Sequence, residues 1–332
     1  MIKFFKLFFL VLFFFNSNAK ANIPEFELWL KSFKILAKKQ GISESTIKNT
    51  LGNSKFLPKV IEYDRYQPEF YEDTFTYINK RATNYKVKKG ISLFKKEEKT
   101  INKIEKEFSV SKELLIALMG IETNFGKYLG KMDIISSLAT LSFDKRRSEF
   151  FTNELLTLLK LIDKDIIDYK ILYGSWAGAF GNFQFMPSTI KQYAIDYDNN
   201  SIIELKSIDD SFASAANYIS KIGWNDKEPC FHKIELKKEI PRKYLNTSAK
   251  KIKNKRKLKF FKKYIKNYEL INVDENFLAG IITPDKDIVS VSNDLEPAYI
   301  VFNNYELILK WNRSLRFALA VCTLKDKIKN EI

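Results

Sequence analysis

One carboxylate in this sequence, Glu122, directly follows an almost wholly apolar run, residues 114–121. Burial against apolar side chains disfavours the charged form of a carboxyl group and raises its pKa, so the group can donate a proton near neutral pH. General acid catalysis at a glycosidic oxygen requires such a group. The alternative is a glutamate at a helix end that turns to solvent beside Gly126.

Several other chemistries are excluded by what the sequence lacks. His232 is the only histidine, so a Ser-His-Asp triad would have to use it, and zinc sites built on two or three histidines are impossible. The sequence also has no Gly-x-Ser-x-Gly elbow, no P-loop and no dinucleotide-binding fingerprint. Any catalysis therefore rests on carboxylates, hydroxyls and amides.

Six of the eleven glycines fall between residues 120 and 181. Because glycine has no side chain, the backbone of this part of the chain can approach a ligand or another segment closely. The densest stretch, residues 174–188, also carries aromatic side chains that can cover sugar rings. Ser175 and Gln184 offer hydrogen bonds to a ligand lying on this loop. The alternative is a turn between packed helices, with a hydroxyl residue capping the next helix.

The elements that would position these residues are mostly helical, because apolar residues recur with the i, i+3, i+4 spacing. The helix that ends near Glu122 would deliver it to the site. The predicted helices are residues 26–37, ending at Gly41; 43–52, with Ser43 as cap; 95–108; and 111–122, with Ser111 as cap.

From about Asp226 the pattern changes to short β-rich runs, residues 288–291 and 299–302, separated by turn sequences. This predicts a small β-containing subdomain. The chain then returns to a helix, whose apolar face is Leu315, Ala318, Leu319 and Cys322 of residues 312–327.

The first 21 residues have the features of a secretory signal peptide. Lys3 and Lys6 precede an apolar core, residues 7–15, and Ala19-Lys20-Ala21 forms an A-x-A cleavage site. The core is about half the ~20 residues that a membrane span needs, and no cysteine stands near the cleavage site to take a lipid. We therefore expect a soluble protein, exported to the periplasm, without a transmembrane segment.

The net charge of +16 is largely local, since residues 250–266 hold ten basic residues and no acidic one. This lysine stretch is either a solvated face or a surface attracted to an anionic polymer, such as a cell-envelope glycan or a membrane. Export disfavours nucleic acid as a partner. Cys230 and Cys322 could pair in an oxidising compartment, but two cysteines do not make a disulfide framework, so their pairing stays open.

Several long motifs, in order along nearly all of the mature chain, closely resemble those of lytic murein transglycosylases of the B type. The motifs are Asp64-Arg65-Tyr66-Gln67-Pro68-Glu69-Phe70, Gly120-Ile121-Glu122-Thr123, residues 138–143, Arg146-Arg147-Ser148-Glu149-Phe150-Phe151, residues 174–187 and Asn312-Arg313-Ser314.

The resemblance implies a mainly α (α+β) protein with a lysozyme-like helical catalytic core, an N-terminal α region and a small inserted β-containing subdomain. The implied divisions are a signal peptide at 1–21, an N-terminal α region at 22–108, the catalytic core at 109–225, the β-containing subdomain at 226–305 and a C-terminal helix that returns to the core at 306–332.

The resemblance also implies cleavage of the MurNAc-GlcNAc β-1,4 bond of peptidoglycan, with a 1,6-anhydromuramoyl end as product. A hydrolase would normally place two carboxylates around the bond. Here Glu122 alone would protonate the leaving oxygen, the substrate's N-acetyl group would stabilise the cationic centre, and the carboxylate would then deprotonate the muramoyl C6 hydroxyl. The reaction is thus a lyase step that requires no cofactor.

Other family positions carry over one at a time onto residues of the cleft. Ser175 and Gln184 match cleft residues of the glycine-rich motif, while Asn182 and Phe183 stand where the family often has Tyr and Gly. The remaining matches are Tyr218, a tyrosine lining the cleft; Asn312, an asparagine close to the catalytic acid; and Tyr77, an N-terminal cleft tyrosine.

A further segment resembles the elongated EF-hand-like loop of some family members. Calcium would be held by oxygens of Asp196, Asp198, Asn200 and Asp210 and the Ile202 carbonyl, in a structural role. The last carboxylate comes three places later than usual and Ser201 replaces the turn glycine, and an Asp- and Asn-rich loop is often a simple turn.

Two other functions compete with this interpretation: a non-catalytic peptidoglycan-binding or scaffolding protein, and a muramidase that hydrolyses the same bond. A basic protein that acts on membranes through the lysine stretch would leave the Glu122 region unexplained. The expected partners are glycan strands of peptidoglycan and the machinery of cell-wall synthesis or division.

Overall fold

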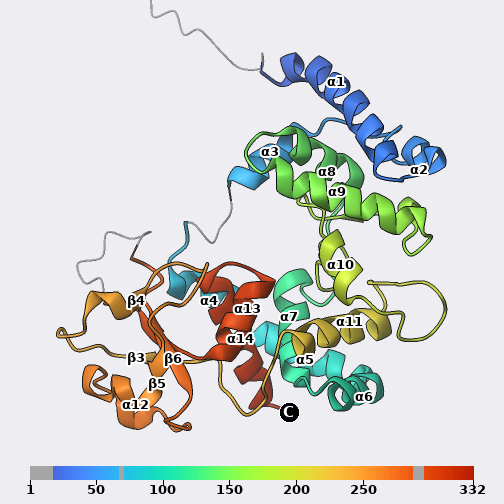
Figure 1. The fold of residues 1–332 in the computed structure, drawn as a ribbon. Helices are drawn as coiled ribbons and strands as arrows, with labels where there is room; N and C mark the ends of the chain where they lie inside the picture. The colour runs from blue at the N-terminus through green and yellow to red at the C-terminus, as the bar shows by residue number, and fades with distance from the viewer. Residues whose placement is uncertain (1–17, 67–70, 287–294) are drawn as a thin grey trace, which may run out of the picture.

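The computed structural model describes residues 18–66, 71–286 and 295–332 (Figure 1). Most of the predicted signal peptide, motif residues 67–70 and the predicted strand at 288–291 lie outside the described residues. The helices are α1 Asn18–Lys39, α2 Glu44–Asn49, α3 Pro58–Arg65, α4 Thr74–Arg81, α5 Asn84–Lys96, α6 Glu98–Phe108, α7 Lys112–Thr123, α8 Ile134–Phe143, α9 Ser148–Asp163, α10 Pro187–Tyr193, α11 Ile208–Lys221, α12 Leu258–Phe261, α13 Asn303–Trp311 and α14 Leu315–Lys329.

The helices form two groups that α10 connects (Figure 1). In the upper group, α1, α2 and α3 pack on the antiparallel pair α8 and α9. In the lower group, α14 packs against α4, α5 and α7, while α11 packs against α6 and α7. Residues 22–108 are therefore shared between both groups, with α1 to α3 above and α4 to α6 below.

The β-containing lobe lies beside the lower helices (Figure 1). Its sheet has the order β3-β7-β6-β4, with β5 also paired to β6; only β4 and β6 run parallel. Its inner face has a core of its own around Phe261, Ile281 and Phe302. The strands are β3 Phe231–Ile234, β4 Leu245–Asn246, β5 Arg256–Lys257, β6 Leu278–Ile282 and β7 Ala298–Val301, and a separate pair is β1 Met132–Asp133 and β2 Tyr173–Gly174.

The helix starts show where local sequence was informative and where it was not. Ser43 caps α2 as predicted, because its hydroxyl accepts the Thr46 N–H at 3.2 Å. Ser111 also precedes its helix, α7, but its side chain makes no capping bond. Instead Glu105 of α6 accepts the Lys112 N–H at 2.9 Å, so the prediction of a serine cap was wrong.

Two helix boundaries differ from the predictions. The predicted helix at 95–108 is divided at Glu97, where α5 ends and α6 begins. The predicted C-terminal helix from residue 312 begins at Leu315, because Ser314 is extended and its hydroxyl accepts the Phe317 N–H at 3.1 Å. The four residues of its predicted apolar face are all buried, and the predicted strand at 299–302 is confirmed as β7.

A disulfide joins Cys230, directly before β3, to Cys322 in the middle of α14. Both residues are buried, and their Cα atoms lie 6.2 Å apart. Because the bond closes a loop of 92 residues, it restricts the unfolded chain and fixes the sheet to the helical core. The sequence left the pairing of Cys230 and Cys322 open, and the fold brings the two residues close enough to bond.

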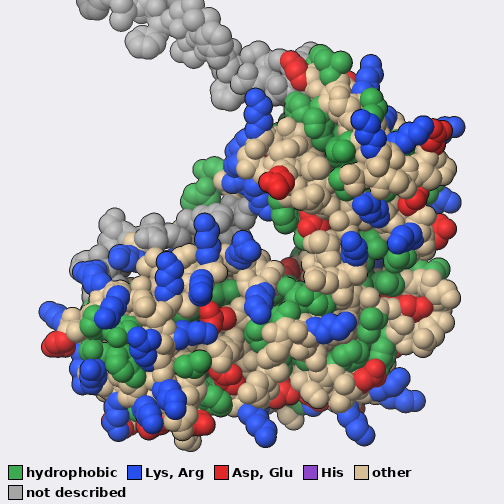
Figure 2. Space-filling model, viewed as in Figure 1, with side chains coloured by type: hydrophobic (Ala, Val, Ile, Leu, Met, Phe, Trp, Pro, Cys, Tyr) green, Lys and Arg blue, Asp and Glu red, His purple; other side chains and the backbone are tan. Residues whose placement is uncertain are grey.

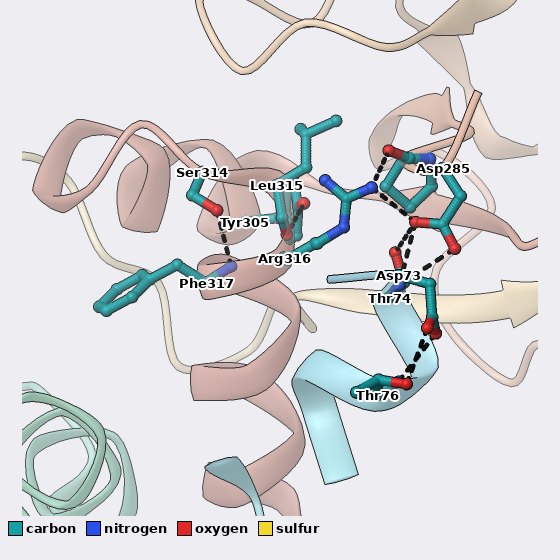
Figure 3. Close-up of polar contacts among 10 residues, drawn as sticks. Asp73, Thr74, Thr76, Asp285, Tyr305, Ser314, Leu315, Arg316 and Phe317 are labelled. Atoms are coloured by element: carbon teal, nitrogen blue, oxygen red, sulfur yellow. Dashed lines mark hydrogen bonds and ion pairs between the residues drawn. The ribbon is translucent and has the colours of Figure 1, made fainter. Parts of the chain in front are cut away.

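A buried ion pair fixes three elements at one point (Figure 3). Arg316 of α14 donates to Asp285, beyond the end of β6, at 2.7 Å, and both side chains are buried. The same carboxylate accepts the backbone N–H of Thr74 at 3.0 Å and its hydroxyl at 2.5 Å. Since Thr74 begins α4, the pair sets the position of α4 against the sheet and α14.

A similar arrangement explains two of the sequence motifs in the upper group. Asp64 of α3 is almost fully buried. Its carboxylate accepts from Arg146 Nε at 2.8 Å and from Arg147 Nη1 at 3.1 Å. These residues lie before α9, so the two motifs hold α3 against the α8–α9 turn.

Candidate active site

Helix α7 carries Glu122 out of the core. Residues 114–120 are all buried, whereas Glu122 in the last turn is partly exposed. The backbone then turns sharply, because Asn124, Phe125 and Gly126 all have positive φ values, of 51°, 61° and 76°. This turn ends the helix and leaves the carboxylate at the rim of an apolar wall.

Trp311 holds this carboxylate. Its indole Nε1 donates a hydrogen bond to Glu122 Oε1 at 2.9 Å. Trp311 is the last residue of α13, so the contact joins residues 189 positions apart in sequence. An indole donates but does not accept, so it fixes the carboxyl oxygen without competing for a proton on the other oxygen.

A stack of aromatic rings continues from Trp311 along one side of the site. Tyr218 lies nearly parallel to Trp311, with centroids 5.1 Å apart, and Tyr193 lies on its other face at 4.3 Å. Phe185 meets the edge of both Trp311 and Tyr218. The outer rings of this stack, Trp311 and Tyr193, are half-exposed, and flat aromatic faces of this kind are suited to the apolar faces of sugar rings.

Tyr218 was predicted to line the cleft, and its hydroxyl is fixed as well as its ring. Burial raises the pKa of Tyr218 to about 12, and the neighbouring Tyr193 acts in the same direction. The hydroxyl therefore remains protonated and donates to the Lys310 carbonyl at 3.2 Å. This bond links α11 to the end of α13 beside Trp311.

The glycine-rich loop is held by Ser175. Its hydroxyl accepts the N–H groups of Ala177 and Ala179 at 3.2 and 3.0 Å. Gly178 has φ +89°, and a Cβ there would lie 2.4 Å from Leu138. Ser175 therefore shapes the loop from within, and the loop packs too closely on α8 to accept a larger residue at Gly178.

Gln184 has a positive φ of 50° at the end of the same loop. Its amide nitrogen donates to the Gly181 carbonyl at 2.9 Å and to the Leu129 carbonyl at 3.3 Å. Leu129 follows the turn after Glu122, so Gln184 connects the glycine-rich loop to the segment that leaves the catalytic helix.

The two residues that depart from the family pattern are buried. Thr123 Oγ1 donates to the Asn182 carbonyl at 2.9 Å, and the Asn182 amide donates to Ser211 Oγ at 3.0 Å. Phe183 packs edge-on against Phe212, with centroids 5.1 Å apart. Asn182 therefore connects α7 to α11, and Phe183 fills the core beneath the site.

Lys86 of α5 approaches the site from the other side. Its ammonium donates to the Gly120 carbonyl at 2.7 Å, two residues before Glu122. The pKa of Lys86 is lowered to about 8, first by burial and then by the charge of Arg81, whereas Glu122 acts in the opposite direction. By reciprocity, the charge of Lys86 favours the ionised form of Glu122.

Tyr77 and Asn312, the other two predicted site residues, lie on two further elements. Tyr77 is buried in α4, with the Arg81 guanidinium 3.5 Å above its ring centroid. Asn312 is partly exposed and ends α13, directly after Trp311.

The proposed metal ligands also meet in space. Carboxylate oxygens of Asp196, Asp198 and Asp210 lie within 4.8 Å of one another. Ser201 adopts φ +73°, the left-handed conformation for which the family's glycine would be suited. Asp210 is buried and accepts backbone N–H groups of Tyr197 and Glu204, both at 2.7 Å, so it closes the loop at its base.

The structure thus brings Glu122 and Tyr218 together through Trp311. Gln184 bonds to Leu129, which follows the turn after Glu122. The loop at 196–210 is a separate cluster. Sequence reasoning missed Trp311, Tyr193 and Lys86, whose roles depend on contacts between distant helices. The sequence contained one indication of Trp311, because this residue directly precedes the predicted site residue Asn312.

Most of the chain matches a known class of enzymes. A family model described as a transglycosylase SLT domain matches residues 25–326, so the chain belongs to the lytic transglycosylase family. The predicted family and the predicted mainly helical, lysozyme-like fold with a small β-sheet are confirmed.

Particular relatives can then be named. The chain is 38% identical over 149 residues to the membrane-bound lytic murein transglycosylase B of Escherichia coli K12; this match covers 45% of this chain but only 41% of that relative. SltB3 of Pseudomonas aeruginosa, solved in complex with NAG-anhNAM-pentapeptide, is 29% identical with a TM-score of 0.79, over 92% of this chain and 79% of that one. Slt35 of Escherichia coli, solved in complex with calcium, is 25% identical with a TM-score of 0.74, over 94% of each chain.

Proposed function

We propose that this protein is a lytic transglycosylase that cleaves the MurNAc-GlcNAc β-1,4 bond of peptidoglycan without water, giving 1,6-anhydromuramoyl ends. The observation that carries the proposal is the setting of Glu122, at the rim of an apolar wall with Trp311 fixing one oxygen. SltB3, a relative that covers most of the chain, was solved with an anhydromuramoyl ligand.

In this mechanism Glu122 acts twice. As an acid it protonates the glycosidic oxygen, and the substrate's N-acetyl group stabilises the positive charge that develops at C1. The resulting carboxylate, with Lys86 nearby, then takes the proton from the C6 hydroxyl, which closes the anhydro ring. Trp311 supports the sugar ring, Tyr218 lines the cleft behind it, stacked between Trp311 and Tyr193, and Ser175, Gln184, Asn312 and Tyr77 shape the cleft.

Digestion of purified peptidoglycan followed by mass spectrometry tests the proposal against its alternatives. A lytic transglycosylase releases muropeptides with anhydromuramoyl ends, whereas a muramidase releases reducing ends. Sedimentation of the protein with the polymer without any released product would favour the binding protein instead.

Removing the charge of Lys86 is expected to change the pH dependence of this reaction. In Lys86→Met, Glu122 loses a nearby cation and keeps its proton to higher pH. The alkaline limb of kcat/KM should therefore move up by about half a unit to one unit. The wild type loses the same charge above about pH 8, so the two curves should converge there.

The matched control for this variant is Lys88→Met, which removes an exposed lysine of the same helix. Its pH profile should coincide with that of the wild type. An unchanged limb in Lys86→Met, or one displaced to lower pH, would contradict the proposed influence of Lys86 on Glu122.

We further propose that the loop at 196–210 binds calcium in a structural role. Asp196, Asp198, Asn200 and Asp210 supply carboxylate and amide oxygens, and calcium accepts six to eight such ligands in flexible geometry. The clustering of three carboxylates and the glycine-like φ of Ser201 support this assignment, with the Ile202 carbonyl as a further ligand. The chemistry of the cleft does not involve this ion.

Calcium at about 100 times its Kd should raise the unfolding free energy by about 2.7 kcal/mol, or Tm by roughly 4 °C for a chain of this length. Asp198→Asn should abolish this increase, because it weakens one ligand on the exposed side of the loop. Asp209→Asn, which changes a neighbouring carboxylate outside the cluster, should keep it. The same increase in both variants, or none in the wild type, would argue against a calcium site.

For the localisation we propose export to the periplasm by the signal peptide at 1–21, without a lipid anchor. Among the described helices, none combines the length and apolar character that a bilayer span requires. Glycan strands are the proposed substrate, and proteins of wall synthesis or division are the proposed partners.

A further inference from the structure

A hollow of about 420 Å³ lies between α13 and the start of the lysine stretch. Its charged lining consists of Lys250 and Lys251 on one side and Glu306, Lys310 and Arg313 on the other. Figure 2 shows Lys and Arg side chains gathered over the neighbouring β-containing lobe. The described mechanism uses none of these cations.

The positive charge of the hollow is not neutralised by nearby carboxylates. Glu306 forms an ion pair with Lys255 and also accepts the Ile252 N–H at 3.3 Å. Within residues 18–66, 71–286 and 295–332, neither Lys250, Lys251, Lys310 nor Arg313 has an ion-pair partner. Four exposed cations around one neutralised acid form a site that attracts anions.

The hollow adjoins the candidate active site at the last turn of α13. Lys310 lines the hollow, and its carbonyl accepts the Tyr218 hydroxyl. The next residue, Trp311, turns its indole to Glu122. Since Lys310 and Trp311 are consecutive residues, whose Cα atoms lie about 3.8 Å apart, the hollow and the candidate active site share the last turn of α13.

We propose that this hollow binds the carboxylate of a stem peptide on the muramoyl residue that lies in the cleft. The inference rests on the proposed function, because it places the muramoyl ring beside Glu122. A pentapeptide spans up to about 17 Å when extended, and its C-terminal carboxylate complements the four cations. The ligand in the SltB3 complex carries such a pentapeptide. The protein therefore acts preferentially on peptide-bearing strands.

The test is calorimetric binding of NAG-anhNAM-pentapeptide and of the same disaccharide without peptide. In Lys250→Gln/Lys251→Gln, the Kd of the peptide-bearing ligand should rise about three- to tenfold, which is in the range for two exposed charge contacts, and that of the bare disaccharide should not change. Lys250→Arg/Lys251→Arg should retain wild-type affinity. Lys257→Gln/Lys259→Gln, in the same stretch but outside the hollow, should alter neither Kd.

An unchanged Kd in Lys250→Gln/Lys251→Gln, or an equal loss in Lys257→Gln/Lys259→Gln, would overturn the proposal. Unchanged peptide affinity with lost binding to phosphatidylglycerol vesicles would assign the hollow to a membrane instead. Because binding is measured without turnover, the proposal for the hollow and the proposal for the reaction can be rejected independently of each other. If the wild type cleaves peptidoglycan as proposed but Lys250→Gln/Lys251→Gln keeps its peptide affinity, the proposal for the hollow alone is rejected. If the affinities change as expected but the wild type gives no anhydromuramoyl products, the proposed reaction alone is rejected.

Discussion

The Glu122→Gln variant is expected to lose at least about 10³-fold of the peptidoglycan-cleaving activity, because a general acid or base alone contributes about 10²–10⁴-fold. Glutamine keeps the shape of the side chain and an oxygen that can accept the Trp311 N–H. It cannot donate a proton to the glycosidic oxygen, nor remove one from the C6 hydroxyl. Release of soluble muropeptides over time measures the loss.

The matched control is Glu113→Gln, which removes a carboxylate from the first turn of the same helix. This variant should retain most of the activity. Both variants should unfold close to the wild-type midpoint, because neither residue is fully buried. Activity of Glu122→Gln within tenfold of the wild type would mean that another group transfers the proton.

The second large effect is expected at the buried ion pair of Figure 3. Asp285→Ala leaves the Arg316 guanidinium buried without this carboxylate and removes an acceptor from Thr74. Removing one partner of a buried ion pair costs about 3–5 kcal/mol. Urea unfolding should therefore show a loss of this size, and α4 should loosen from the sheet.

Two further variants make this prediction specific. Arg65→Ala breaks an ion pair with Asp144 in which the arginine side chain is 52% exposed, and it should cost less than about 1 kcal/mol. Adding Arg316→Met to Asp285→Ala should recover part of the loss, because no buried charge remains. A loss in Asp285→Ala no larger than that in Arg65→Ala would contradict the structural role of the pair.

The sequence predicted best those features that depend on neighbouring residues. The apolar run before Glu122 forms α7, Ser43 caps α2, and residues 299–302 overlap β7, because spacing and local hydrogen bonds determine each of these. The family motifs predicted the fold class, and the family comparison confirms it.

The remaining features depend on residues distant in sequence. Glu105 satisfies the first N–H of α7, that of Lys112, whereas the Ser111 side chain makes no capping bond, so the cap comes from the preceding helix. Trp311 meets Glu122 only because α13 and α14 fold back over α7. Local patterns contain no information on such contacts, so the electrostatic setting of the catalytic carboxylate could not be predicted.

The most direct test of the central claim is digestion of peptidoglycan in water enriched in ¹⁸O, followed by mass spectrometry of the muropeptides. The account predicts anhydromuramoyl products that carry no ¹⁸O, because the C6 hydroxyl of the substrate replaces water. Reducing muramoyl ends labelled with ¹⁸O would contradict it and would show that the enzyme is a hydrolase.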